Sequence, residues 1–197
     1  MQDDSSNGAL TPARFGAMIA EGYTAPRQSM ARILSFQPSE QSRLLMVVIG
    51  TVISMIGYLA LGQRTQEVGL SGIVFGYAVT TLAAILQYYV SAWVIGTACR
   101  AFGGKGQPEQ DRTMIAWLSL VTSPVSVIML LGLQGSSSPV LALLVIIVAI
   151  VLFILLSAYI AEVHGFHSTA RVAGAMMALM IVISLVMSSF ISMPVPA

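Results

Sequence analysis

The chain has 197 residues, of which 56% are hydrophobic and only 9% are charged. Because a soluble domain carries about a quarter charged residues, this composition excludes an ordinary water-soluble fold and indicates an integral membrane protein. The formal net charge of +1 and the lack of a long basic cluster exclude nucleic acid as a partner.

The N-terminal region, residues 1–43, is polar or mixed in composition. Residues 1–10 are small, acidic and polar, so a flexible tail is expected there. Pro12 and Pro26 each follow a threonine closely, and proline is favoured in the first turn of a helix. The region is therefore predicted to be a cytoplasmic tail followed by two short helices.

The second of these helices has an apolar face. Met30, Ile33 and Leu34 fall on one side of it, and Arg32 projects from the other. This arrangement is typical of a helix that lies in the membrane interface. It fits equally well a helix that packs on the cytoplasmic ends of the membrane helices, and the sequence leaves both interpretations open.

The rest of the chain, residues 44–197, is predicted to be a membrane domain. Charge-free stretches of about 20 residues are long enough to cross a bilayer, and a longer one, 113–161, is divided by the turn-forming residues 135–139 (GSSSP). The predicted spans cover residues 44–61, 72–98, 113–133, 139–161 and 172–193. The expected fold class is all-α, a polytopic membrane protein with five transmembrane helices and a cytoplasmic N-terminal interfacial helical segment.

The basic residues predict the orientation of these spans. Eight of the nine Lys and Arg residues fall on the same side of the membrane as the N-terminus, and only Arg64 falls on the other. Because connections rich in Lys and Arg stay in the cytoplasm, the N-terminus is predicted to be cytoplasmic. With five spans, the C-terminus is expected on the opposite side.

Three segments carry a family resemblance: residues 25–40 (APRQSMARILSFQPSE), 102–128 (FGGKGQPEQDRTMIAWLSLVTSPVSVI) and 161–176 (AEVHGFHSTARVAGAM). They resemble, in order, the helix before the first span, the glycine-rich cytoplasmic loop with its proline-containing helix, and the last helix connection of the Yip family, the Ypt-interacting proteins. The resemblance extends over about residues 25–190 and is strongest to bacterial members.

This resemblance implies a fold more strongly than an activity. Eukaryotic members of the family bind Rab-type GTPases and shape early secretory membranes, whereas bacterial members have no such GTPase traffic. For this chain the resemblance implies the bacterial inner (cytoplasmic) membrane, with a periplasmic C-terminus.

One cluster of side chains has the chemistry of metal ligands. Glu162, His164 and His167 combine a carboxylate with two imidazoles, which suits zinc. Their spacing is unfavourable, because Glu162 points away from the face shared by the histidines and Gly165 is expected to end the helix between them. A solvated cytoplasmic turn is the favoured interpretation, and no metal or cofactor is predicted.

Polar side chains inside the predicted spans form a second candidate site. Gln87 in the second span and Ser123 beside Pro124 in the third are candidates to line a polar path. The favoured alternative is packing, because such groups form interhelical hydrogen bonds and hydroxyls satisfy carbonyls that a proline leaves without a donor.

Small residues predict close helix packing. Gly72 and Gly76 form a GxxxG pair, and Gly174 lies in a row of small residues spaced four apart. Packing within one bundle is the first interpretation of these positions, and homodimerisation is the second.

No nucleophile, base and orienting acid can be assembled from the sequence, so an enzyme is not predicted. The predicted function is a non-catalytic integral membrane protein that binds proteins or organises membrane. The alternative is a small solute transporter or channel that acts as an oligomer. The expected partners are membrane lipid and either another protein or further copies of the chain.

Overall fold

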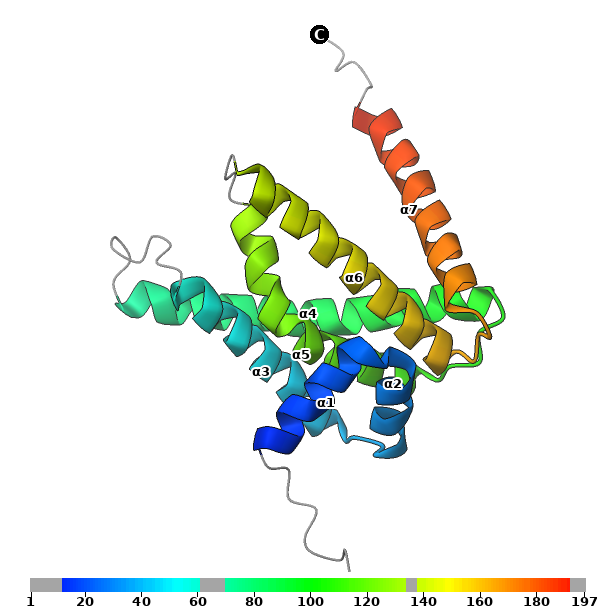
Figure 1. Cartoon of the computed structure of the whole chain (residues 1–197), viewed down its shortest axis with the longest axis horizontal. Helices are drawn as coiled ribbons and strands as arrows, with labels where there is room; N and C mark the ends of the chain where they lie inside the picture. The colour runs from blue at the N-terminus through cyan, green and yellow to red at the C-terminus, as the bar shows by residue number, and fades with distance from the viewer. Residues whose placement is uncertain (1–11, 61–69, 134–137, 192–197) are drawn as a thin grey trace, which may run out of the picture.

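The computed structural model describes residues 12–60, 70–133 and 138–191 (Figure 1). The described residues form α-helices and no strand, which confirms the all-α prediction. The helices are α1 (Pro12–Thr24), α2 (Pro26–Ser35), α3 (Glu40–Ala60), α4 (Leu70–Ala101), α5 (Pro108–Leu133), α6 (Pro139–Val163) and α7 (Thr169–Ile191). The tail predicted at residues 1–10 lies outside the described residues.

Helix α5 is the centre of the molecule. It packs against α3, α4 and α6 and is also contacted by α1 and α2. Proline occupies its first position, and Glu109 and Asp111 lie in its first turn, where acidic groups favour the helix dipole. Its Trp117 and Val121 are buried with Tyr159 of α6 in the hydrophobic core.

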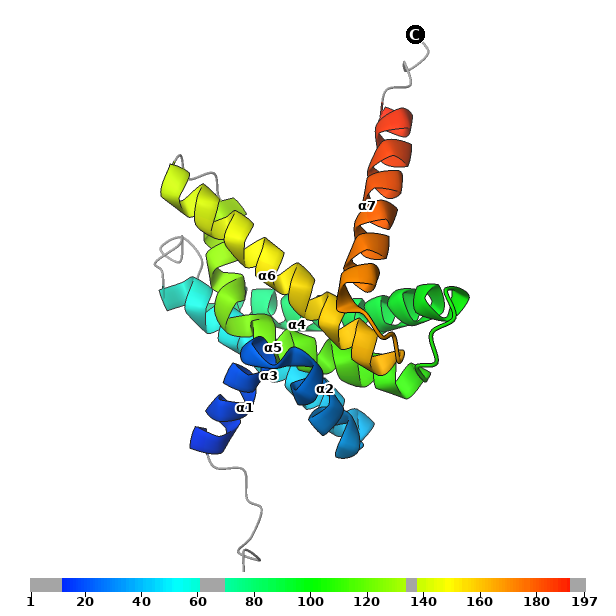
Figure 2. The same ribbon diagram turned by 45° about the vertical axis from the view of Figure 1, so that its right-hand side comes forward.

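Helices α1 and α2 pack on the membrane helices. Pro26 opens α2, and Met30 and Ile33 are buried, while Arg32 is exposed on the opposite side. Figure 2 shows both helices beside α5 and the end of α6. The sequence left open whether α2 lies in the membrane interface or packs on the ends of the membrane helices. In the structure it packs on α5 and α6.

Helices α6 and α7 meet at a tight turn and then diverge (Figures 1 and 2). The hydroxyl of Ser138 accepts a hydrogen bond from the amide of Leu141 and caps the start of α6. Gly165 follows the end of α6 with φ +70°, a left-handed conformation that favours glycine. This turn brings the start of α7 beside the end of α6.

Three of the described helices are long and apolar enough to cross a membrane: Glu40–Gly57, Ser71–Ala101 and Pro139–Val163. The prediction of five spans is therefore too high for the described chain. Helix α7 has a shorter apolar stretch, Thr169–Val182, and α5 combines a charged first turn with several hydroxyl side chains. The prediction was based on charge-free length, whereas the apolar stretch that the structure describes in α7 is shorter than a membrane crossing needs.

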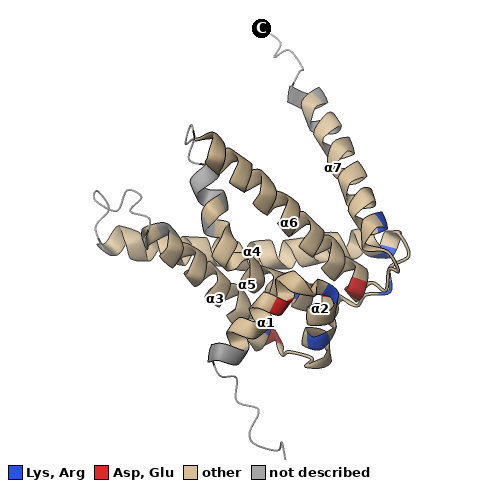
Figure 3. Ribbon diagram, in the orientation of Figure 1, with Lys and Arg blue, Asp and Glu red and all other residues tan. Residues whose placement is uncertain are grey.

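Charged side chains gather at one end of the molecule (Figure 3). They lie on α1 and α2, on the adjoining ends of the membrane helices and on the loops between them, and we call this region the charged end. The opposite ends of α6 and α7 carry no charged residue in the part that the structure describes. Arg64, the basic residue predicted for the far side, lies outside the described residues.

Candidate functional site

An ion pair fastens the N-terminal helices to α6. The Nε atom of Arg27 in α2 lies 2.9 Å from Oε2 of Glu162 at the end of α6. The same guanidinium donates to the backbone carbonyls of Phe166 and His167 at 3.4 Å each. Arg27 therefore holds both the end of α6 and the turn that leads into α7.

Buried hydrogen bonds fasten the same helices to α5. The indole of Trp117 donates to the hydroxyl of Ser29 at 3.1 Å, and the hydroxyl of Tyr23 donates to the carbonyl of Val121. At Gly22 an added Cβ would lie 3.0 Å from Val121 and 3.1 Å from the hydroxyl of Tyr159. The close approach of α1 to α5 and α6 therefore depends on this glycine.

The carboxylate of Glu40, at the start of α3, interacts with two arginines and two tyrosines. Glu40 lies 2.8 Å from Arg43 and 3.5 Å from Arg112, and it accepts hydrogen bonds from Tyr88 at 3.1 Å and Tyr89 at 2.9 Å. These groups adjoin a polar cleft of about 650 Å³ between the turn after α2 and the start of α5. Sequence reasoning missed the cluster because its members come from three separate helices.

A second cluster lies where the α4–α5 loop meets the end of α6. The carboxylate of Asp111 is 1% exposed, and it pairs with Arg100 at 2.7 Å and with Nε2 of His164 at 3.0 Å. The His164 contact is an ion pair when the ring is protonated. Asp111 therefore joins α4, α5 and α6 through charge.

Glycines make room for this cluster. A Cβ on Gly96 would collide with the carboxylate of Asp111, and a Cβ on Gly104 or Gly106 would come within 2.8 Å or 2.6 Å of the ring of His164. The amide of Gly106 donates to Nδ1 of that ring at 3.2 Å. The glycine-rich loop can therefore pack directly against the buried ring of His164.

The protonation of His164 reflects opposing influences. Burial lowers its pKa, and the Gly106 amide also favours the neutral ring. The carboxylate of Asp111 and the thiol of Cys99 raise the pKa by more than burial lowers it, so the pKa of His164 rises to about 9. The ring therefore favours its charged form beside Asp111.

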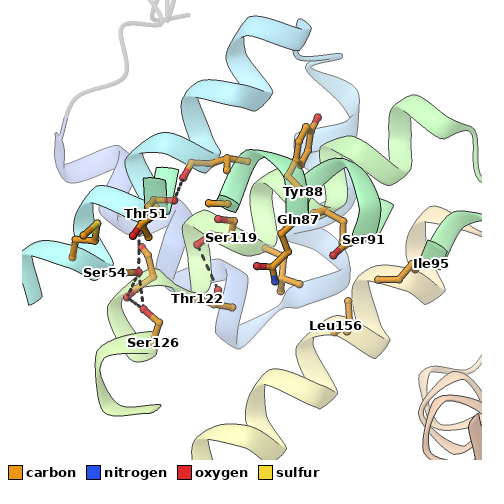
Figure 4. A pocket seen from close by; sticks show the side chains of 18 residues that line it. Thr51, Ser54, Gln87, Tyr88, Ser91, Ile95, Ser119, Thr122, Ser126 and Leu156 are labelled. Atoms are coloured by element: carbon orange, nitrogen blue, oxygen red, sulfur yellow. Dashed lines mark hydrogen bonds between the residues drawn. The ribbon is translucent and has the colours of Figure 1, made fainter. Parts of the chain in front are cut away.

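A cavity of about 720 Å³ lies among α3, α4, α5 and α6. Figure 4 shows Gln87 of α4 projecting toward hydroxyls of α5. The polar side chains that line it are Thr51, Ser54, Thr80, Gln87, Tyr88, Ser91, Ser119, Thr122, Ser123 and Ser126. No acidic or basic side chain lines this cavity in the part of the chain that the structure describes.

A family model described as the Yip1 domain matches residues 22–190. The chain belongs to the Yip1 domain family. This confirms the resemblance seen in the three sequence segments, and it identifies the chain as an integral membrane protein with apolar helices suited to that role. No curated protein and no solved structure matches the chain.

The matched region of the Yip1 domain begins in α1 and ends in α7. It therefore includes the end of α1, the whole of α2, the Asp111–His164 cluster and the polar cavity. The site is thus a property of the whole domain and not of an added segment.

The three residues considered as metal ligands, for which a solvated turn was the favoured interpretation, each have a different partner. Glu162 pairs with Arg27, His164 pairs with Asp111, and the carbonyl of His167 accepts from Arg27. Within residues 12–60, 70–133 and 138–191, no group of three His, Cys, Asp or Glu side chains is placed to hold a metal ion. The cluster serves instead to join helices at the charged end.

Two of the three candidates for a polar path lie at one cavity and the third does not. Gln87 and Ser123 line the cavity, whereas Pro124 is exposed and does not. Pro124 removes the amide that would pair with the carbonyl of Leu120, and the hydroxyl of Ser123 donates to that carbonyl at 2.8 Å. The hydroxyl of Ser123 thus satisfies the carbonyl that Pro124 leaves without an amide donor, as the packing interpretation predicts.

The predicted packing glycines are not at close helix approaches within the chain. A Cβ on Gly76 or Gly174 would meet nothing within 4 Å, and Gly72 is exposed. The tight contact between α3 and α5 occurs at Gly50, where a Cβ would lie 2.9 Å from the carbonyl oxygen of Ser119. The homodimerisation interpretation of the predicted positions stays a prediction.

Proposed function

We propose that this Yip1 domain protein is non-catalytic and binds other proteins, or organises membrane, through its charged end. The observation that carries the proposal is the docking of α1 and α2 on α5 and α6. The Arg27–Glu162 ion pair and the buried side chain of Met30 join these helices to the membrane helices. A partner held on α1 and α2 is therefore held firmly at the membrane surface.

The surface beside this helix pair has the composition of a protein interface. Phe36 at the end of α2 is 64% exposed, and the adjoining polar cleft is lined by Gln37 and Glu109, which are both exposed. An aromatic side chain next to polar groups is typical of the residues that dominate protein–protein binding. We propose that the partner binds over Phe36 and this cleft.

We further propose that the charged end is cytoplasmic and that the protein resides in the bacterial inner membrane. The described Lys and Arg residues gather at this end, and basic residues are retained in the cytoplasm. Helix α7 runs away from the charged end (Figure 1), so the N-terminus is cytoplasmic and the C-terminus periplasmic in this proposal.

Affinity purification from native membranes in mild detergent tests the partner proposal. The purified material is analysed by mass spectrometry together with its oligomeric mass. We expect a reproducible partner whose recovery falls severalfold with Phe36→Ser and with Glu109→Lys. Phe36→Ser at an exposed position should change the free energy of unfolding by less than about 0.5 kcal/mol, and Glu109→Lys, which reverses a charge in the first turn of α5, by about 1 kcal/mol.

The matched control is Gln28→Lys, an exposed position on α2 outside the polar cleft. This variant should retain the partner. Recovery that is unchanged by both test variants, or lost equally with the control, would contradict the proposed surface.

A second candidate function is solute passage, because the cavity of about 720 Å³ is lined by hydroxyls and by Gln87. Its uncharged lining suits a neutral polar solute and not an ion. Swelling of proteoliposomes in glycerol, measured by light scattering, tests this function. Uptake that is faster than in empty liposomes and is blocked by Gln87→Trp would support it, and uptake equal to that of empty liposomes would exclude it for this solute.

A further inference from the structure

A cleft of about 320 Å³ lies at the charged end, apart from the polar cavity and the polar cleft. The end of α4, the turn between α6 and α7, and the first turns of α7 form its walls. Phe102, Phe166 and Met176 give these walls apolar surface, and Ser168 and Arg171 supply polar groups. This size falls within the range of roughly 300–1,000 Å³ typical of ligand sites.

The cation in this cleft has no anionic partner. Among the described residues, Arg171 makes no ion pair, and its side chain is exposed. Two acidic groups of the charged end are already engaged, since Glu162 pairs with Arg27 and Asp111 pairs with Arg100. The cleft therefore combines an unpaired positive charge with an apolar wall.

The charge and the apolar wall are arranged along one face of α7. Arg171, Val172, Met176 and Leu179 all line the cleft, and at the rise of an α-helix the first and last of them are about 12 Å apart along its axis. Arg171 lies in the first turn of α7 at the charged end, and Leu179 lies about two turns further along the same helix, where no charged residue follows. One occupant would thus span from the polar boundary into the apolar region.

We propose that this cleft binds one anionic phospholipid, with its phosphate at Arg171 and Ser168 and one acyl chain along Met176 and Leu179. An anion without a chain would leave the apolar wall uncovered, and a lipid without net negative charge would leave Arg171 uncompensated. A membrane protein meets phospholipid on all sides, and the geometry of this cleft selects a molecule that is anionic at one end and apolar at the other.

Native mass spectrometry of the full chain in mild detergent tests the proposal with two probes, phosphatidylglycerol and phosphatidylcholine. We expect one retained phosphatidylglycerol per chain, about fivefold more than phosphatidylcholine, a factor matching the attraction of one basic residue to an anionic headgroup. Arg171→Gln should remove this preference. Arg32→Gln, which removes an equal charge at the same end but outside the cleft, should leave it unchanged.

A second variant separates a lipid from a free anion. Ala175 lines the cleft, and Ala175→Phe fills it, so retention of phosphatidylglycerol should fall although Arg171 is intact. Inorganic phosphate should not displace the lipid. Equal retention of the two lipids, a preference that survives Arg171→Gln, or displacement by phosphate with no effect of Ala175→Phe would each overturn the proposal.

Cys99 provides an independent readout in the wild-type chain. It is the single cysteine of the protein and it lines the cleft. Phosphatidylglycerol should slow its reaction with N-ethylmaleimide, and phosphatidylcholine should slow it less. A reaction rate that is the same with either lipid as with none would also overturn the proposal.

Discussion

At the scale of single residues, the buried pair of Asp111 and His164 makes stability depend on pH. The pKa of His164 is raised from its ordinary value of 6.5 to about 9, because Asp111 and Cys99 outweigh the opposing effect of burial. A raised pKa means that the folded state binds the proton more tightly than the unfolded state. The stabilisation is therefore fully present below about pH 6.5 and is lost as the pH rises toward about 9.

Asp111→Asn tests this charge pairing. It removes the carboxylate that favours the protonated ring and takes from Arg100, which is partly exposed, its anionic partner, so a loss of about 1.5–3 kcal/mol is expected, as for a lost hydrogen bond to a charged group. The remaining pH dependence between about 6.5 and 9 should flatten. Thermal unfolding of the detergent-solubilised protein across this pH range measures both effects.

The matched comparison is Glu21→Gln, which breaks an exposed pair with Arg32. Its cost should stay within about 1 kcal/mol, as for surface ion pairs, and it should leave the pH profile of the wild type unchanged. An Asp111→Asn protein with the wild-type profile would refute the role assigned to the pair.

The sequence identified one half of this pair and not the other. His164 stood out beside Glu162 and His167 as a ligand-type residue, and a solvated turn was favoured there over a metal site. Its actual partner, Asp111, is distant in sequence, and sequence spacing carries no information about such a contact. The glycines at 96, 104 and 106 that make room for the pair were visible, but their purpose depends on which side chain lies against them.

At the scale of elements, α2 should contribute to the stability of the membrane helices. Met30 is fully buried between α2 and the core, so Met30→Ala should cost about 2–5 kcal/mol, as for other core truncations. Gln28 lies on the exposed side of the same helix, and Gln28→Ala should change stability by less than about 0.5 kcal/mol. Thermal unfolding in detergent compares the two variants, and equal melting temperatures would show that α2 is not docked in solution.

Element boundaries followed closely from composition, whereas the role of each element did not. Pro26 and Pro139 open helices as the sequence predicted, whereas Pro108 opens α5 five residues before the predicted span 113–133 begins. The two interpretations of α2 differ in what its apolar face contacts, which is a tertiary property.

At the scale of the whole molecule, membrane insertion was predictable because it depends on averages over many residues, and the family was predictable because three long segments of the sequence resemble it. A low charged fraction and long charge-free stretches persist whatever the detailed packing. The polar cavity was only partly predictable: Gln87 and Ser123 were identified from their depth in apolar segments, but the outward position of Pro124 follows from how α5 is rotated against α3 and α4. That rotation is set by packing between helices.

The charged residues at one end of the molecule predict its orientation in the membrane. In a Cys99→Ala background, single cysteines at Lys105 and at Val140 report on the charged end and on the far end of α6. Both positions are exposed, and Val140 is 75% exposed. Because basic residues are retained in the cytoplasm, a membrane-impermeant maleimide added to intact spheroplasts should label Val140→Cys and not Lys105→Cys. After lysis both should react, which controls for reactivity, and labelling of Lys105→Cys in intact spheroplasts would reverse the proposed orientation.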